Sequence, residues 1–341
     1  MTVVPPARDD ALELEGEKLP RGQRTRMVLR AAELADGSWV ELPVVVVRGH
    51  QPGPVLYLGA AIHGDEVNGV EIVARVTREV DLDELRGTIL AVPVQNPIAF
   101  RIQHRHPLGL MLKSPMDQNP PDVWVAFPGD PNGNTSAVIA HALWDRLMRH
   151  ADCLLDIHTP TTGGRYAPFA FLPPPRCGTI VADAEQLARA FGADFILAND
   201  TGMYVGDRNP HVVAAERGIV ALGVELGEGG RLEPGEVERG VRGVRNVLRA
   251  RGMLPGAPES FGRQLVIRTM TVVRARRAGL LRVVAPLGAD VGAGQRLATV
   301  TDIFGEVVEE LTAPHAGPVV RVATFPTVAT GERVAQLGVP R

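Results

Sequence analysis

The sequence has few cysteines, few aromatic residues and no long apolar run. Only two of its 341 residues are cysteines, Cys153 and Cys177, which is too few for a disulfide framework or a thiolate metal site. No uninterrupted run of about 18 apolar residues occurs, so no transmembrane helix is expected. The chain also starts without a basic segment followed by an apolar stretch, so no secretory signal is expected. These absences predict a cytoplasmic protein that does not bind membranes.

The charge balance is close to neutral. Lys and Arg number 36 and Asp and Glu number 39, for a formal net charge of −3. This balance gives no electrostatic reason to expect binding to nucleic acid, so a small molecule is the expected partner. The composition, 45% hydrophobic and 22% charged, is typical of a soluble globular protein, and the length favours a main domain with a smaller one.

The pattern along the chain predicts an α/β main domain. Residues 1–25 are charged and without period, which indicates an N-terminal arm, and a hairpin is expected from 27–32 and 39–47. Apolar strands then alternate with helices, which favours a largely parallel sheet covered on both faces. The expected strands are 54–61, 88–94, 153–157 and 219–224, and the expected helices are 67–80, 135–148, 182–191 and 234–251.

Two further regions depart from this alternation. Residues 104–134 contain six prolines and no clear period, which is typical of a long functional loop. After about residue 260 only short β segments follow, and 285–300 resembles 323–338 in having a strand, a V-x-x-G turn and another strand. We therefore expect a catalytic α/β domain over 26–260 and a small all-β, barrel-sandwich-like domain over 261–341. No lysine follows Lys113, so this second domain cannot carry a lipoyl or biotinyl group.

Imidazole and carboxylate groups stand at the carboxyl ends of three expected strands. His63 and Glu66 follow the expected strand 54–61, His158 directly follows 153–157, and Glu225 directly follows 219–224. A bare H-x-x-E pair is a weak signal in a chain of this length. Its placement is more informative, because ligands bind at the carboxyl edge of open parallel sheets.

Two histidines and one carboxylate with an open fourth position are typical of a catalytic zinc site. We therefore expect one Zn²⁺ per chain, held by His63, Glu66 and His158. Zinc makes water a usable nucleophile near neutral pH, but a base must still take its proton, and Glu225 is placed for that role. Asp156 either fixes the tautomer of a ligand histidine or caps a loop, and the sequence leaves both readings open.

These motifs resemble the succinylglutamate desuccinylase/aspartoacylase family, relatives of the zinc carboxypeptidases. The resemblance rests on HGDE after a buried strand, N-P at Asn96, Arg105 nine residues later, FPG at 127–129, D-I-H at 156–158 and V-E-L-G at 224–227, and it covers roughly residues 40–330. It implies a three-layer α/β/α domain with a mixed sheet, a zinc ion on His63, Glu66 and His158, and Glu225 as general base. It also implies that Arg105 polarises the scissile carbonyl during hydrolysis of an amide between an acyl group and an amino acid or amine.

One departure from the family concerns substrate binding. Relatives commonly carry D-L-N-R-x-F-P-G, in which the Asn and Arg hold a substrate carboxylate, whereas this chain has Trp124 and Val125 at those positions. Because a bidentate arginine contact is geometrically demanding, the change predicts a different or differently held substrate. The candidate substrate-binding residues are Asn96, Trp124 and Arg165, with Arg101 and Lys113 as other possible cations.

Three functions remain open at this point. The leading hypothesis is a zinc-dependent amidohydrolase that cleaves a small N-acyl amino acid or N-acyl amine. The alternatives are a carboxypeptidase-like hydrolase of peptides and an inactive binding protein that retains the metal. The oligomeric state cannot be read from the sequence, and a homo-oligomer is possible.

Overall fold

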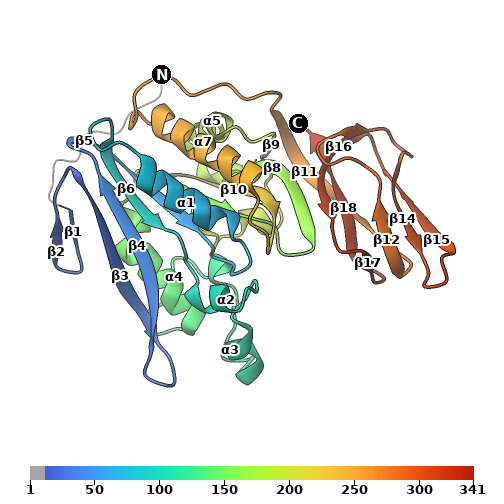
Figure 1. The fold of residues 1–341 in the computed structure, drawn as a ribbon, viewed down its shortest axis with the longest axis horizontal. Helices are drawn as coiled ribbons and strands as arrows, with labels where there is room; N and C mark the ends of the chain where they lie inside the picture. Colours follow the sequence, from blue (N-terminus) through green and yellow to red (C-terminus); the bar gives the residue numbers. More distant parts are fainter. Residues whose placement is uncertain (1–11) are drawn as a thin grey trace.

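The structure, a computed structural model, describes residues 12–341 and is dominated by one mixed sheet of twelve strands (Figure 1). The four central strands run parallel, and antiparallel strands flank them on both sides. Across the sheet the order is β13 (Asp290–Val291), β16 (Gly317–Ala323), β18 (Arg333–Pro340), β11 (Leu265–Arg274), β9 (Phe195–Leu197), β8 (Gly164–Phe171), β10 (Val220–Glu228), β7 (Cys153–His158), β5 (Gln51–Ala60), β6 (Arg86–Val92), β4 (Trp39–Arg48) and β3 (Gln23–Glu33).

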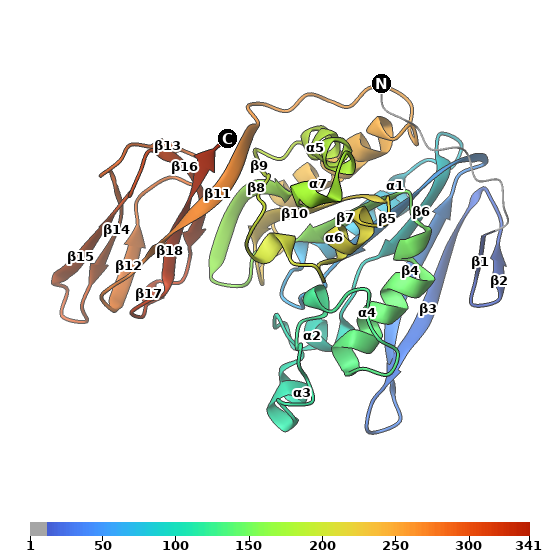
Figure 2. The ribbon, with the colours of Figure 1, turned by 180° about the vertical axis from the view of Figure 1, so that it is seen from behind.

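Helices pack on both faces of the sheet, so the central strands are apolar on both sides. Every residue of β7 and β10 is buried, which explains why these strands are nearly continuous apolar runs in the sequence. Helices α1 (Asn68–Glu79), α5 (Ile180–Phe191) and α7 (Pro234–Ala250) lie together on one face, around one hydrophobic cluster. Helices α4 (Thr135–Arg146) and α6 (Pro210–Ala215) lie on the other face, around a second cluster (Figure 2).

The predicted α/β alternation is confirmed, and its strands and helices agree with the structure to within a few residues. The sequence patterns missed β8 and β9. Strand β8 contains Gly164 and Pro168, residues that are unfavourable in strands, and β9 is only three residues long. Because β8 runs antiparallel to β10, these two strands help to make the sheet mixed.

The N-terminal arm and the long loop carry more regular structure than the sequence indicates. Of the predicted arm, residues 1–11 lie outside the described part, while β1 (Leu12–Leu14) and β2 (Glu17–Leu19) form a hairpin. The predicted loop 104–134 contains the short helix α3 (Leu108–Lys113), and another short helix, α2 (Pro97–Arg101), precedes it. Both lie in the lower part of the molecule in Figure 1.

The main sheet continues into the C-terminal β strands. The first residues of β11 pair in parallel with β9, and the rest of the strand pairs antiparallel with β18. Strand β16 also pairs with β8, which ties the C-terminal strands to the main body. A second, four-stranded sheet completes this region, with β12 (Gly279–Val283), β14 (Arg296–Thr301), β15 (Val307–Thr312) and β17 (Thr327–Val328). Two small hydrophobic clusters pack among these strands.

Candidate active site

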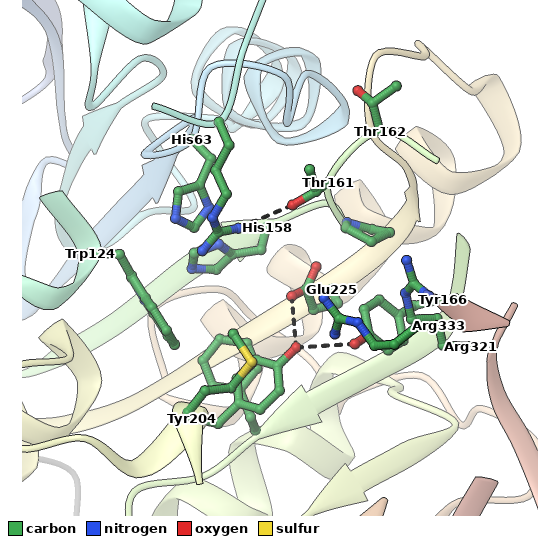
Figure 3. A pocket seen from close by; sticks show the side chains of 14 residues that line it. His63, Trp124, His158, Thr161, Thr162, Tyr166, Tyr204, Glu225, Arg321 and Arg333 are labelled. Atoms are coloured by element: carbon green, nitrogen blue, oxygen red, sulfur yellow. Dashed lines mark hydrogen bonds between the residues drawn. The ribbon is translucent and has the colours of Figure 1, made fainter. Parts of the chain in front are cut away.

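A cavity of about 370 Å³ opens at the carboxyl ends of the central parallel strands. The expected groups His63, His158 and Glu225 line it, together with residues from the C-terminal strands (Figure 3). The full lining consists of His63, Arg105, Trp124, His158, Pro160, Thr161, Thr162, Tyr166, Phe171, Met203, Tyr204, Glu225, Arg321 and Arg333. This location is where ligands bind in open sheets with parallel strands.

His63 and Glu66 are presented by the short loop between β5 and α1. The chain leaves β5 through Ala61, whose φ of 46° lies in the left-handed region and turns the backbone sharply. Gly64 then packs against α2 so closely that a Cβ would lie 2.0 Å from the backbone of Ala99. A side chain at this glycine would therefore displace the loop and the two groups it carries.

The side chains of His63, Glu66 and His158 converge on one buried point. Nδ1 of His63 lies 2.6 Å from Oε1 of Glu66, and Nδ1 of His158 lies 2.9 Å from Oε2 of the same carboxylate. One potential ligand atom from each residue lies within 4.8 Å of the others, and all three residues are buried. Together they form a group that could hold a metal ion.

The opposite ring nitrogens of both histidines face carboxylates. Nε2 of His158 lies 2.8 Å from Oδ2 of Asp156, and Nε2 of His63 lies 3.1 Å from Oδ1 of Asp122. A carboxylate on Nε2 holds the ring proton there and leaves the Nδ1 lone pair free to bind a metal. Both histidines thus have the partner that metal-binding histidines usually have, and the donor set fits Zn²⁺.

The charged groups of this cluster shift one another's pKa values. Burial would raise the pKa of Glu66, but the two histidines outweigh burial and lower the pKa to about 2. Burial opposes the charge of His158, yet Asp156 and Glu66 raise its pKa well above the ordinary value. The carboxylates of Glu66, Asp156 and Asp122 thus favour positive charge at the two histidines, which is the electrostatic environment that a bound cation needs.

Glu225 lies beside the three grouped residues, on β10. It is the register partner of His158 on β7, and the pairing of β10 with β8 shifts immediately after it. Oε1 of Glu225 accepts a hydrogen bond from the Tyr204 hydroxyl at 3.3 Å, whereas Oε2 is buried with no hydrogen-bond partner among the described residues. Burial, followed by the negative charge of Glu66, raises the pKa of Glu225 to about 7. A carboxyl group in this environment is suited to exchange a proton near neutral pH.

Arg105 reaches the cavity from the loop after α2. Its guanidinium donates to Oδ2 of Asp122 at 3.1 Å and to Oγ1 of Thr161 at 3.2 Å. Burial would lower the pKa of Arg105, but Asp122 and Glu66 outweigh this effect and raise the pKa. The cation is thus held at the edge of the His63–Glu66–His158 group.

The three candidate substrate-binding residues have different positions. Trp124 lies in a short 3₁₀ turn (Val123–Val125), is 2% exposed, and lines the cavity beside His158, with ring centroids 5.6 Å apart. Asn96 does not line the cavity, and its Oδ1 caps α2 by accepting from Ala99 N at 3.2 Å. Arg165 does not line it either, because its guanidinium pairs with Glu233 and Glu236.

The remaining cations suggested by the sequence are also outside the cavity. Arg101 and Lys113 are exposed, and neither belongs to the lining. The cations present in it besides Arg105 are Arg321 and Arg333, from β16 and β18.

The sequence patterns did not predict several residues that line the cavity or contact His63. Asp122 begins the D-V-W-V-A-F-P-G segment, so its place in the family motif could have marked it. Tyr166 and Tyr204 lie in segments whose structure the periodicity did not predict. Arg321 lies in the C-terminal region predicted to contain short β segments, but nothing in the sequence indicates that one of them pairs with β8.

Comparison with known proteins identifies the family of this chain. The profile of the succinylglutamate desuccinylase/aspartoacylase catalytic domain matches residues 52–251. The chain therefore belongs to the succinylglutamate desuccinylase/aspartoacylase family.

Individual relatives match over nearly the whole chain. An N-alpha-acetyl-L-2,4-diaminobutyric acid deacetylase from Halomonas elongata is 29% identical over 88% of this chain and 86% of its own. A succinylglutamate desuccinylase/aspartoacylase structure from Rhodobacter sphaeroides is 28% identical, covers 93% of this chain and 96% of its own, and has a TM-score of 0.79. The product-bound ectoine utilization protein EutE (DoeB) from Ruegeria pomeroyi is 25% identical, covers 97% and 100%, and has a TM-score of 0.82. Membership in this family of deacylases indicates a hydrolase that acts on amide bonds.

Proposed function

We propose that the protein is a zinc-dependent deacylase that hydrolyses the amide bond of a small N-acyl amino acid or N-acyl amine. The observation that carries this proposal is the arrangement of the two histidines. Each turns Nδ1 toward Glu66 and has a carboxylate on Nε2, and Glu225 lies next to them with one free oxygen.

One Zn²⁺ per chain would be held by His63, Glu66 and His158. When bound, zinc acidifies water and polarises a carbonyl oxygen. Asp122 and Asp156 keep the ring protons on Nε2, so that the ligand nitrogens stay free.

Glu225 and Arg105 would carry out the proton transfer and the charge stabilisation. The free Oε2 of Glu225 can take a proton from the attacking water, and the same carboxyl can then deliver a proton to the leaving amine. Arg105 is held by Asp122 and Thr161, so its charge is fixed in place before the carbonyl oxygen becomes anionic. The Tyr204 hydroxyl orients the Glu225 carboxylate through Oε1.

The cavity wall formed by Trp124 disfavours substrates that need a carboxylate-binding group there. Because the family's Asn and Arg are replaced there by Trp124 and Val125, N-acetyl-aspartate and N-succinyl-glutamate are expected to be poor substrates. The Halomonas elongata relative is a deacetylase of an amino acid that bears an amine, and a substrate of that kind agrees with the sequence expectation of an apolar, neutral or amine-bearing group at this wall.

The predicted domain boundaries, cellular location and substrate size are also part of this proposal. We infer a three-layer catalytic domain over 26–260 and an all-β, barrel-sandwich-like domain over 261–341, in a cytoplasmic protein. Within residues 12–341, no helix has the length and apolar character needed to cross a membrane. Residues of β16 and β18 narrow the cavity, which favours small substrates over the peptides of a carboxypeptidase.

A metal and turnover assay tests the proposed function. Purified protein should contain about one zinc per chain, and alanine at His63, Glu66 or His158 should remove it. Glu225→Gln should keep the zinc and lower kcat at least about 100-fold, because it retains size and loses basicity. The exposed Glu306→Gln is the matched control and should behave as wild type.

Three outcomes would contradict the proposal. Stoichiometric zinc in His158→Ala would remove that residue from the ligand set. Near-normal turnover by Glu225→Gln would place the base elsewhere. Zinc-loaded wild type that binds N-acyl amino acids without hydrolysing them would be a binding protein.

A further inference from the structure

Two arginines from the C-terminal strands line the cavity beside Glu225. Arg321 lies on β16 and Arg333 on β18, and Figure 3 shows both on the opposite side of Glu225 from Trp124. Arg321 reaches the cavity because β16 pairs antiparallel with β8, where its register partner is Tyr166. The substrate cavity therefore has a cationic wall that comes from outside the matched catalytic region, residues 52–251.

The guanidinium of Arg321 is held in place but lacks an anionic partner. It lies over the Tyr166 ring, 5.9 Å from the centroid, and its Nη2 occupies the space beside Gly164, where a Cβ would lie 2.0 Å away. Nη1 is buried without a hydrogen-bond partner, and no ion pair involves Arg321 within residues 12–341. Burial lowers the pKa of this guanidinium and outweighs the opposite effect of the nearby Glu225 carboxylate, so its charge is partly desolvated. A partly buried cation without a direct anionic partner is costly, which indicates that an anionic ligand completes the site.

The other arginines near the site already have carboxylate partners. Arg105 pairs with Asp122, and Arg165 pairs with Glu233. Arg333, like Arg321, is in no ion pair with a described residue, so the two form a doubly cationic wall that faces open space. Glu225 lies nearby and acts on Arg321 through its charge, but it forms no hydrogen bond or ion pair with either arginine, so an anion placed between them would make the direct contact.

We propose that Arg321, with Arg333 beside it, binds the α-carboxylate of the substrate, so that the enzyme acts on N-acyl amino acids rather than on N-acyl amines. This inference rests on the proposed function and narrows its substrate class. A planar guanidinium matches a carboxylate through two parallel hydrogen bonds. Arg321 thereby supplies from β16 the carboxylate contact that Trp124 and Val125 cannot make.

The test compares two probes that differ only at the carboxylate. Zinc-loaded wild type, Arg321→Met, Arg321→Lys and the control Arg282→Met are assayed on Nα-acetyl-L-2,4-diaminobutyrate and on its α-carboxamide. Arg282 lies on β12, is exposed, and does not line the cavity. We expect Arg321→Met to lower kcat/KM for the acid by about 10- to 100-fold, mainly through KM, and to leave the carboxamide nearly unchanged.

The conservative variant separates recognition from folding. Arg321→Lys keeps the charge but loses the planar fork, so its loss on the acid should lie between those of wild type and Arg321→Met. It also keeps the cavity wall charged if the methionine variant fails to fold. Equal losses on both probes, or no loss on the acid, would overturn the inference.

Binding measurements keep this inference distinct from the proposed function. If zinc-loaded wild type hydrolyses neither probe, the proposed function fails, and calorimetry with the same probes tests the arginine alone. Tighter binding of the acid than of the carboxamide by wild type, lost in Arg321→Met, would support the carboxylate site. Equal affinities for the two probes would overturn it.

Discussion

Replacing Asp156 by Asn tests whether a buried carboxylate sets the tautomer of His158. Asp156 is fully buried, and it accepts from Gln95 Nε2 at 2.8 Å through Oδ1 while its Oδ2 lies 2.8 Å from Nε2 of His158. Gln95 cannot turn around freely, because its Oε1 accepts from the Tyr57 hydroxyl at 2.8 Å. Asp156 is therefore an acceptor that faces two donors.

Asparagine at this position has one acceptor and one donor group, so one contact must become donor against donor. If the NH₂ of Asn faces Nε2 of His158, the ring proton moves to Nδ1, the atom that would bind the metal. Loss of such a supporting contact costs about 10- to 100-fold in metal affinity, or about 1.4–2.8 kcal/mol. Asp156→Asn should therefore bind zinc more weakly by this amount and need added zinc for full turnover.

The assay is zinc competition with a chelator, combined with thermal unfolding to confirm that the variant folds. The exposed Asp200→Asn is the matched control and should bind zinc as wild type does. A folded Asp156→Asn protein with wild-type zinc affinity would refute the reasoning, because the tautomer would then not depend on this carboxylate.

Two other predictions concern groups outside the metal ligands. Burial lowers the pKa of His211 to about 4, so unfolded protein takes up a proton that the folded state resists, and stability falls as pH drops from about 6.5 toward 4. Between pH 7 and pH 5, urea unfolding of wild type should show a loss about 2 kcal/mol greater than that of His211→Gln, and equal losses would contradict the assignment. Cys153 is buried with its pKa raised to about 12, whereas Cys177 is partly exposed, so a thiol reagent should modify about one cysteine in native protein and both after denaturation. Rapid modification of both thiols in native protein would show that the sheet around Cys153 opens.

The sequence predicted the central sheet and the convergence of His63, Glu66 and His158, for a local reason. Strands β5, β7 and β10 contain nearly continuous apolar runs because helices cover both faces, and that pattern is visible in the residues themselves. His63, His158 and Glu225 follow or end those strands, so their convergence was predictable from the rule that parallel strands share a carboxyl edge.

The carboxylate behind His63 and the cations that line the cavity were not predictable in the same way. Asp122 contacts His63 across 59 positions of sequence, through a loop without periodicity. The predicted cation Arg165 is instead paired with Glu233 and Glu236, from the start of α7 and the residue before it, a pairing that depends on how that helix packs.

What the sequence alone determined is therefore the α/β alternation, the family motifs and the identity of the residues proposed to bind zinc and transfer the proton. Only the tertiary structure decided which cations face the substrate cavity. Arg321 lies 155 residues beyond Tyr166, and the two meet because β16 pairs with β8 in one register. Side chains brought together by a long-range strand pairing leave no periodic signal in the sequence, because the register depends on packing over the whole sheet.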